Sequence, residues 1–273
     1  MAMLRNSALM EKAAAKLPPV QSHDNGLPVY FLTGKKYLYQ TLFCIQSLRK
    51  TTTAKFQFIL VDDGSFDDQL IHQINTGLPG VKLVTKEQIE QNLKEKLPLA
   101  DYPSLHHKRK VYPHIKKLTD VHTIPGKPWK LVLDSDMLFW AEPEEMLGWL
   151  KNPDKPIHMI DCAESYGYSS PLMEQLASTK IKQLINVGAI GLNSDNIPWG
   201  DMDSWVHKLE TEEGASYYLE QALSAMIISR TNALALNKNN YIVNPTTLST
   251  GILHHYVDRS KEQYFNFAWK SFI

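Results

Sequence analysis

The stretch that decides the fold is Lys130-Leu131-Val132-Leu133-Asp134-Ser135-Asp136-Met137-Leu138-Phe139. Its short apolar run, flanked by polar and turn-forming residues, predicts a buried strand of a parallel sheet. The strand ends in two carboxylates one residue apart, although aspartates are poor strand formers and costly to bury unpaired. Ligands of open α/β sheets bind at this end of the strands, so Asp134 and Asp136 are candidate ligands of Mg²⁺ or Mn²⁺, which could hold a diphosphate. The alternative is a solvated turn, because so short a motif often matches by accident.

The composition argues against several classes of function. The 273 residues are 43% hydrophobic and 21% charged, which is ordinary for a soluble globular chain. Zero formal net charge and the lack of a long basic run argue against a nucleic-acid partner. No apolar run reaches membrane-spanning length. Cys44 and Cys162 lack C-x-x-C spacing and lie in apolar stretches, so we expect reduced core residues of a cytoplasmic protein.

The N-terminal part differs from the rest of the chain. Residues 1–26 mix acidic and basic charges and contain Pro18-Pro19, which is not the pattern of a signal peptide. We expect a short amphipathic helical extension that packs on the domain. Neither a linker nor an internal repeat follows. Residues 27–273 are therefore predicted to form one α/β domain, with a mostly parallel central sheet flanked by helices.

Two earlier strands also end in candidate ligand groups. Residues 27–34 predict a strand ending in Thr33-Gly34, and residues 55–61 a strand ending in Asp62-Asp63-Gly64-Ser65. A helix over 37–50 joins them, so they should be parallel neighbours in a βαβ unit. The ends of these strands and of the Asp134 strand then meet at one edge, which is sufficient for a nucleotide and a metal, without a G-x-G-x-x-G motif or P-loop. Asp62 or Asp63 could instead be a turn or helix N-cap residue.

The remaining elements are less regular. The basic and aromatic stretch 106–117 should open a helix running to about Val121. Residues 185–193 predict a strand whose glycines indicate a close approach to the backbone. An apolar run over 251–256 contains His254 and His255. Further helices are expected over 67–75, 86–96, 143–150, 205–213 and 218–229, and further strands over 81–84, 156–161 and 241–243.

Together these features resemble a glycosyltransferase with the GT-A fold, in which an Asp-x-Asp motif holds the metal of a nucleotide-sugar donor. Three stretches are similar to the retaining family 8 type: Ile185-Asn186-Val187-Gly188-Ala189, Glu220-Gln221 where the family has Asp-Gln, and His255-Tyr256 with Lys261 six residues after the histidine. Asp258, Glu262 and Gln263 replace the Gly, Pro and Trp of that family's lysine segment. This divergence and the Asp-Asp-Gly-Ser stretch also suggest family 2, whose members are inverting.

The resemblance implies roles for the candidate residues. The metal, Mn²⁺ or Mg²⁺, would be bound by Asp134, Asp136 and His255. Strand alternation points His254 and His255 to opposite faces, and the sequence leaves open which of them is the ligand. The donor-binding set would be Thr33, Gly34, Asp62 and Asp63 beside the nucleoside, Ser135 within the motif, Lys116 or Lys117 reaching the donor, and Lys261 on the diphosphate. The sugar-facing set would be Asn186 and Gln221, with Glu220 as the base if the reaction inverts.

The expected activity is metal-dependent transfer of a sugar from a UDP-sugar to a hydroxyl of a glycan or lipid-linked acceptor, with retention. Three alternatives stay open: inverting transfer, a sugar-phosphate nucleotidyltransferase and a non-catalytic sugar-nucleotide-binding protein. Some residues also have simpler interpretations. Arg109 could lie on a solvated face, and Glu220 could be a helix first-turn acid favoured by the dipole. The aromatic end 264–272 could be a packing segment or a peripheral membrane contact.

Overall fold

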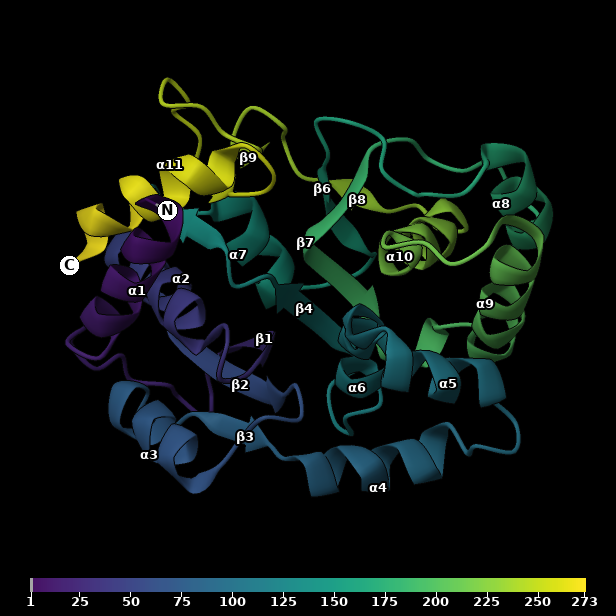
Figure 1. Ribbon diagram of the computed structural model, residues 1–273, viewed down its shortest axis with the longest axis horizontal. Helices are drawn as coiled ribbons and strands as arrows, with labels where there is room; N and C mark the ends of the chain where they lie inside the picture. The colour runs from purple at the N-terminus through teal and green to yellow at the C-terminus, as the bar shows by residue number, and fades with distance from the viewer. Residues whose placement is uncertain (1) are drawn as a thin grey trace.

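A seven-stranded sheet crosses the computed structural model, which describes residues 2–273 (Figure 1). Its strand order is β3-β2-β1-β4-β7-β6-β8. The strands are β1 (Leu27–Thr33), β2 (Phe56–Asp62), β3 (Lys82–Val84), β4 (Trp129–Leu133), β6 (Ile157–Ile160), β7 (Ile185–Asn193) and β8 (Leu234–Ala235). Among the described strands of this sheet, only β7 runs antiparallel to its neighbours. The predicted α/β class and mostly parallel sheet are confirmed.

Helices cover both faces of this sheet because its apolar side chains alternate. On β1, Val29 and Phe31 belong to one buried core and Tyr30 to the other. The first core is covered by α1 (Ala2–Ala14), α2 (Leu38–Thr51), α3 (Asp68–Gly77), α7 (Glu144–Lys151), α11 (Ser260–Asn266) and the 3₁₀ helix η3 (Ala268–Phe272). The second is covered by α4 (Lys86–Lys96), α5 (Pro103–Val111), α6 (Lys116–His122), α8 (Ser170–Ala177), α9 (Trp199–Glu213) and α10 (Leu219–Ser229).

A second, three-stranded sheet adjoins the end of β4. Its strand β5 (Met137–Phe139) directly follows Asp136 and pairs antiparallel with β10 (Leu253–His255). β10 also pairs in parallel with β9 (Tyr241–Val243). The register sets His255 opposite Met137, so the last part of the chain returns to the Asp-x-Asp segment.

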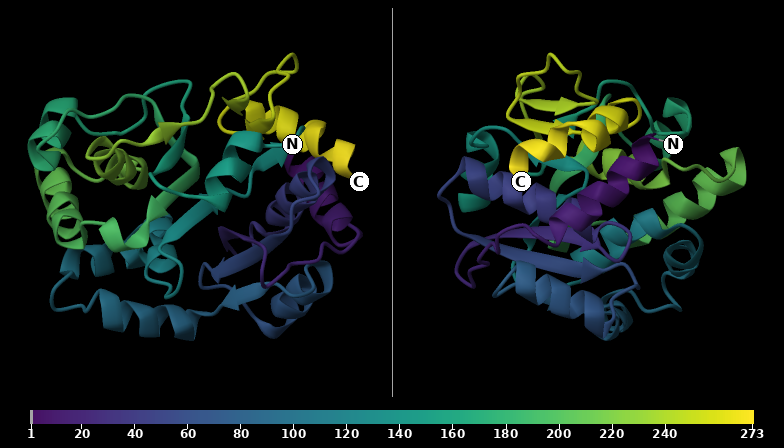
Figure 2. Two further views of the ribbon diagram at one scale, coloured as in Figure 1. Left: turned by 180° about the vertical axis from the view of Figure 1, so that it is seen from behind. Right: turned by 60° about the vertical axis from the view of Figure 1, so that its left-hand side comes forward.

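The two ends of the chain lie side by side, with α1 packed on α2 and α11 (Figure 2). Met10 of α1 is fully buried in the first core, so the expected N-terminal helix packs on the rest of the chain. At the aromatic end, Tyr264, Trp269 and Phe272 are buried in the same core, whereas Phe267 is exposed. Most of this end is therefore a packing segment. No helix within residues 2–273 combines the length and apolarity that a bilayer crossing needs.

Three sequence expectations need correction. The helix expected over 106–121 begins earlier and is divided at Pro113 into α5, the 3₁₀ helix η1 (Pro113–Ile115) and α6, because proline lacks the N–H of a continuous helix. Arg109 is largely buried and donates to Asp120 at 2.6 and 2.9 Å, so it is not on a solvated face. Cys162 is exposed, whereas Cys44 is buried as expected; both are free thiols.

A polar cluster is buried between β4, α6 and the turn after β7. Lys130 Nζ donates to Ser194 Oγ at 2.7 Å, and His122 Nδ1 lies 2.9 Å from the same oxygen. Within residues 2–273, His122 Nε2 has no hydrogen-bond partner. Burial, together with the charge of Lys130, lowers the pKa of His122 to about 3. The folded protein therefore keeps this imidazole neutral.

We predict that His122 makes the fold sensitive to acid. An exposed histidine has a pKa near 6.5, so below this pH the unfolded chain binds a proton that the folded chain does not bind, and stability falls. From pH 7 to pH 5 this group alone should lower the free energy of unfolding by about 2 kcal/mol. Urea unfolding of wild type and His122→Asn at both pH values measures the effect. Between pH 7 and pH 5 the free energy of unfolding should fall by about 2 kcal/mol less in His122→Asn than in the wild type. An equal fall in both proteins would contradict the prediction.

Candidate functional site

The three residues expected to bind a metal converge at the carboxyl end of β4. One ligand atom each from Asp134, Asp136 and His255 lies within 4.8 Å of the other two. His255 Nε2 is 3.6 Å from Asp134 Oδ2 and 3.4 Å from Asp136 Oδ1. Two carboxylates and an imidazole suit a divalent ion such as Mn²⁺. The residues present therefore fit the expected metal, and the Asp-x-Asp segment is not a solvated turn.

The structure distinguishes between the two neighbouring histidines. His254 faces away, with Nδ1 3.3 Å from Tyr256 Oη and its ring against Trp140. His255 Nδ1 lies 3.1 Å from the amide oxygen of Asn186. Because that oxygen can only accept, Nδ1 carries a hydrogen, and Nε2 is the nitrogen that can bind a metal when the ring is neutral. His255, not His254, is therefore oriented as a metal ligand.

A bulge in β7 makes room for His255. The pairing of β6 with β7 shifts register between His158 and Met159, whose partners are Ile190 and Asn186. The bulged segment contains Gly188, where a Cβ would collide with Nδ1 and Cε1 of His255 and lie 3.0 Å from Asn186 Oδ1. The close approach that the glycines of this strand indicated is thus that of the His255 ring at Gly188 and that of Trp149 and Ile157 at Gly191.

Lysines neutralise part of the negative charge. Lys117 is buried, and its Nζ donates to Asp134 Oδ1 at 2.7 Å and to the carbonyl of Val187. This contact leaves Asp134 Oδ2 facing His255. Lys261 Nζ lies 3.5 Å from Asp136 Oδ2, and about half of its side chain is exposed. Lys116 instead donates to the backbone carbonyl of Asp63 at 2.7 Å, which joins α6 to the loop after β2.

The charges of these groups shift one another's pKa values. Burial alone would lower the pKa of His255, but the hydrogen bond and charge of Asp136 raise it. Burial would also lower the pKa of Lys117, which Asp134 and Glu220 raise. Conversely, burial would raise the pKa of Asp136, which His255 and Lys261 lower. The site thus stabilises positive charge next to its carboxylates. A metal bound by His255 would displace the proton of its Nε2, because only the neutral imidazole is a ligand.

The residues expected near the nucleoside divide into two groups. Thr33 is fully buried, and Thr41 Oγ1 lies 2.8 Å from both Thr33 Oγ1 and Ser135 Oγ. Asp62 is also buried, and its Oδ1 accepts from three backbone N–H groups of the following turn. Thr33 and Asp62 therefore hold the ends of their strands, and the turn interpretation of Asp62 agrees with its contacts.

Asp63 lies nearer the surface of the same edge, whereas Gly34 is buried. A Cβ at Gly34 would collide with Asp63 Oδ1 and Ser65 Oγ, so a glycine is needed where the two loops meet. Asp63 is partly exposed, and its Oδ1 accepts from the backbone N–H of Ser65 at 3.0 Å. Of the four residues, Asp63 keeps the most surface for a ligand.

Asp161, which the sequence analysis missed, joins the two amides expected to face the sugar. Its Oδ2 accepts from Asn186 Nδ2 at 2.9 Å and from Gln221 Nε2 at 3.0 Å. Gln221 Nε2 also donates to the carbonyl of Ile185 at 2.9 Å. Both N–H groups of Gln221 are thus used, and its amide oxygen is left for a ligand. The available signal was an aspartate at the end of the strand predicted over 156–161.

Glu220 precedes Gln221 in the first turn of α10, and its side chain is buried. Burial raises the pKa of Glu220 to about 7, although the charge of Lys117 acts to lower it. Ser224 Oγ donates to Glu220 Oε1 at 3.3 Å. Lys117 contacts Asp134, and the charges of Lys117 and Glu220 influence each other's pKa.

Comparison with solved structures identifies the fold. Mouse xyloside xylosyltransferase 1 matches with a TM-score of 0.56 and 13% identity, over 87% of this chain and 98% of that chain. The galactosyltransferase LgtC, in complex with donor and acceptor sugar analogs, matches with a TM-score of 0.56 and 13% identity, over 90% of this chain and 93% of that chain. The bifunctional glycosyltransferase WbbM matches with a TM-score of 0.53 and 9% identity, over 92% of this chain and 51% of that chain. The chain has the GT-A fold. Neither a family model nor a curated protein matches the sequence.

The lysine segment contains a residue with a left-handed backbone. Asp258, which departs from the glycine of the family 8 pattern, has a φ of 44°, in the region that favours glycine. Aspartate tolerates this region better than most residues. The carbonyl of Asp258 accepts from the N–H of Lys261 at 3.3 Å. The substitution of glycine thus leaves Lys261 beside Asp136.

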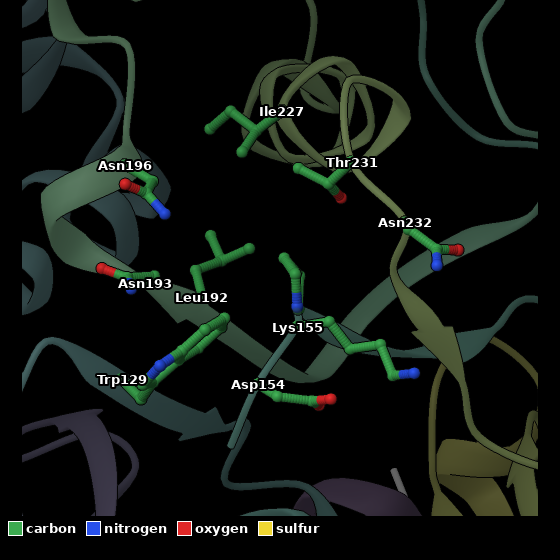
Figure 3. Close-up of a pocket in the computed structure, with 10 residues that line it drawn as sticks. Trp129, Asp154, Lys155, Leu192, Asn193, Asn196, Ile227, Thr231 and Asn232 are labelled. Carbon is green, nitrogen blue, oxygen red and sulfur yellow. The ribbon is translucent and has the colours of Figure 1, made fainter.

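A pocket of about 400 Å³ lies at the opposite edge of the sheet (Figure 3). It is lined by Trp129 at the start of β4, Asn193 at the end of β7 and Lys155 before β6. Its lining is separate from the residues expected in the donor site. This pocket therefore contributes no residue to the cluster of Asp134, Asp136 and His255.

We predict that Gly188→Ala weakens binding of Mn²⁺ by about tenfold or more, because the new methyl group displaces the His255 ring. Isothermal titration calorimetry with Mn²⁺ measures the affinity. Gly148→Ala is the matched control, since a Cβ at Gly148 in α7 meets nothing within 4 Å. Equal Mn²⁺ affinity in wild type and a folded Gly188→Ala variant would show that His255 is not a ligand.

Proposed function

We propose that this protein is a metal-dependent glycosyltransferase. It would transfer a sugar from a nucleoside diphosphate sugar, expected to be a UDP-sugar, to a hydroxyl of a glycan or lipid-linked acceptor with retention of configuration. The observation that carries the proposal is the cluster of Asp134, Asp136 and His255, with Lys261 beside it, at the carboxyl edge of a GT-A sheet. The cytoplasmic location and a peripheral membrane contact stay predictions.

The leaving diphosphate is proposed to lie over the candidate metal site. Mn²⁺ or Mg²⁺ held by Asp134, Asp136 and His255 would neutralise the charge that develops on it. Lys261 is half exposed next to Asp136 and can add a second positive charge. The Lys117 ammonium already donates to Asp134 and to the carbonyl of Val187. We therefore propose that Lys117 orients Asp134 and adds a positive charge beneath the donor without contacting it. The nucleoside would lie at the Gly34 turn and Asp63.

The transferred sugar is proposed to lie against Asn186 and Gln221. Asp161 fixes the Gln221 amide so that its oxygen is available beside the anomeric carbon. A fixed amide oxygen there stabilises the positive charge that develops as the bond to the diphosphate breaks. No strong base is needed on the acceptor side if configuration is retained. This arrangement is the reason we favour retention.

Inverting transfer is the second candidate, because the raised pKa of Glu220, about 7, suits a general base near neutral pH. Its burial and its contact with Ser224 make direct contact with an acceptor hydroxyl harder. The coupling constant of the anomeric proton in the product, read by NMR, separates the two. A product with the anomeric configuration opposite to the donor would replace the retaining proposal with the inverting one.

We predict that the wild type with Mn²⁺ slowly releases UDP from at least one UDP-sugar, and that EDTA abolishes this release. Asp136→Asn should lower the rate about a hundredfold, because the cluster loses a charged ligand. Asp154→Asn, in the pocket at the opposite edge, is the matched control and should behave as wild type. Binding of UDP-sugars without release would support a non-catalytic binder. Release that survives both EDTA and Asp136→Asn would exclude the metal-dependent proposal.

We also predict that Asp161→Asn lowers kcat about tenfold or more while the affinity for Mn²⁺ is unchanged. Oδ2 of Asp161 accepts from the two amides and Oδ1 accepts from the N–H of Cys162. The variant replaces one of these oxygens with an NH₂ donor, so it cannot keep both sets of bonds and the Gln221 amide is held less firmly. Steady-state kinetics with the active UDP-sugar and calorimetry with Mn²⁺ give the two values. Glu164→Gln, an exposed acid in the same segment, is the control. A wild-type kcat in Asp161→Asn would remove Asp161 from the proposal.

A further inference from the structure

A row of aromatic rings lies beside the proposed donor site. Tyr217, in the loop before α10, is 69% exposed. Its ring centre is 5.4 Å from that of Tyr218 and 5.1 Å from that of His114. The His114 ring is in turn 5.3 Å from Tyr112, in the turn between α5 and η1. We call Tyr112, His114, Tyr217 and Tyr218 the aromatic row.

The aromatic row is exposed but fixed. Tyr112 Oη donates to the backbone carbonyl of Tyr217 at 2.5 Å and accepts from the N–H of Glu220 at 3.3 Å. The N–H of Tyr218 donates to Ser216 Oγ at 3.1 Å. Edge-to-face contacts orient the Tyr217 ring between its neighbours. An exposed ring already fixed in this way loses little conformational entropy when a ligand stacks on it.

The aromatic row joins two segments that lead directly into the proposed site. His114 is followed by Lys116 and Lys117, and Tyr217 is followed by Glu220 and Gln221. The Tyr112 hydroxyl bonds both the carbonyl of Tyr217 and the N–H of Glu220. Tyr217 is therefore held at the start of α10, the helix that carries the sugar-facing Gln221.

We propose that Tyr217 and His114 form the stacking surface for the acceptor, and that the acceptor group bound there is a sugar ring. This inference rests on the proposed glycosyl transfer. A pyranose presents a face of C–H groups that packs on an aromatic ring, and its rim of hydroxyls stays free to bond polar groups. The nucleoside is assigned to the loops at Gly34 and Asp63, which follow β1 and β2, whereas Tyr217 precedes α10. An acceptor stacked on Tyr217 is on the Gln221 side, where its hydroxyl must meet the transferred sugar.

The direct test uses methyl glycosides of the common hexoses as probes, with Mn²⁺ and UDP present. Saturation-transfer difference NMR should show sugar C–H protons in contact with the wild-type protein for at least one glycoside. Tyr217→Ala should abolish this contact, and Tyr217→Phe should keep it because the ring is retained. Phe267→Ala is the matched control, since Phe267 is a 65% exposed ring on a different part of the chain. This readout needs no turnover, so it does not depend on the rate of transfer.

The kinetic test uses the glycoside that binds as the acceptor. Tyr217→Ala should raise the acceptor KM about tenfold while the KM for the UDP-sugar stays within about twofold. The stacking proposal is overturned if no glycoside contacts the wild type, if Tyr217→Ala leaves the contact unchanged, or if it weakens UDP as much as the glycoside. That last result would assign the ring to the nucleoside. Failure of the wild type to release UDP from any UDP-sugar would instead overturn the proposed transfer itself.

Discussion

The negative charge at the end of β4 is the constraint on which the rest of the structure depends. Asp134 and Asp136 lie close together and are only partly exposed, so each needs a positive partner. The partners come from three distant elements: Lys117 from α6, His255 from β10 and Lys261 from α11. Removing one partner would leave a partly buried carboxylate unpaired, which costs more than the intact pair contributes. The chain must therefore bring its middle and its end together at this edge.

The backbone carries out this convergence. The N–H of Asp134 donates to the carbonyl of Gly188 at 2.7 Å, and the N–H of Tyr256 donates to the carbonyl of Asp136 at 2.9 Å. The Asp-x-Asp segment is thus held by β7 on one side and by β10 on the other. The small sheet is the device that fixes His255, because its register sets this residue opposite Met137. Side chains positioned by strands in this way need little reorganisation to accept an ion.

The end of a predicted strand indicated Asp134 and Asp136, whereas His255 and Lys261 were implied by the resemblance to GT-A glycosyltransferases. Asp161 also ends a predicted strand, but its partners Asn186 and Gln221 lie far along the chain and only the fold brings them together. For Thr33 the residue type gave no information on burial. The expectation for Arg109 was wrong because it assumed one continuous helix. The chain breaks at Pro113, and α6 then brings Asp120 into contact with Arg109 of α5. That break follows from the proline rule and was predictable.

The two halves of the proposed reaction are built on different kinds of structure. The donor groups are fixed by strands and their hydrogen bonds, whereas the aromatic row lies on loops outside the sheet. Loops tolerate substitution better than strands, so the acceptor surface can change without disturbing the metal cluster. The two halves are nevertheless joined, because Tyr112 accepts from the N–H of Glu220 while donating to Tyr217. In the proposed arrangement, a sugar stacked on Tyr217 would act on the same turn that carries Gln221, and Tyr112 would connect acceptor binding with the anomeric centre.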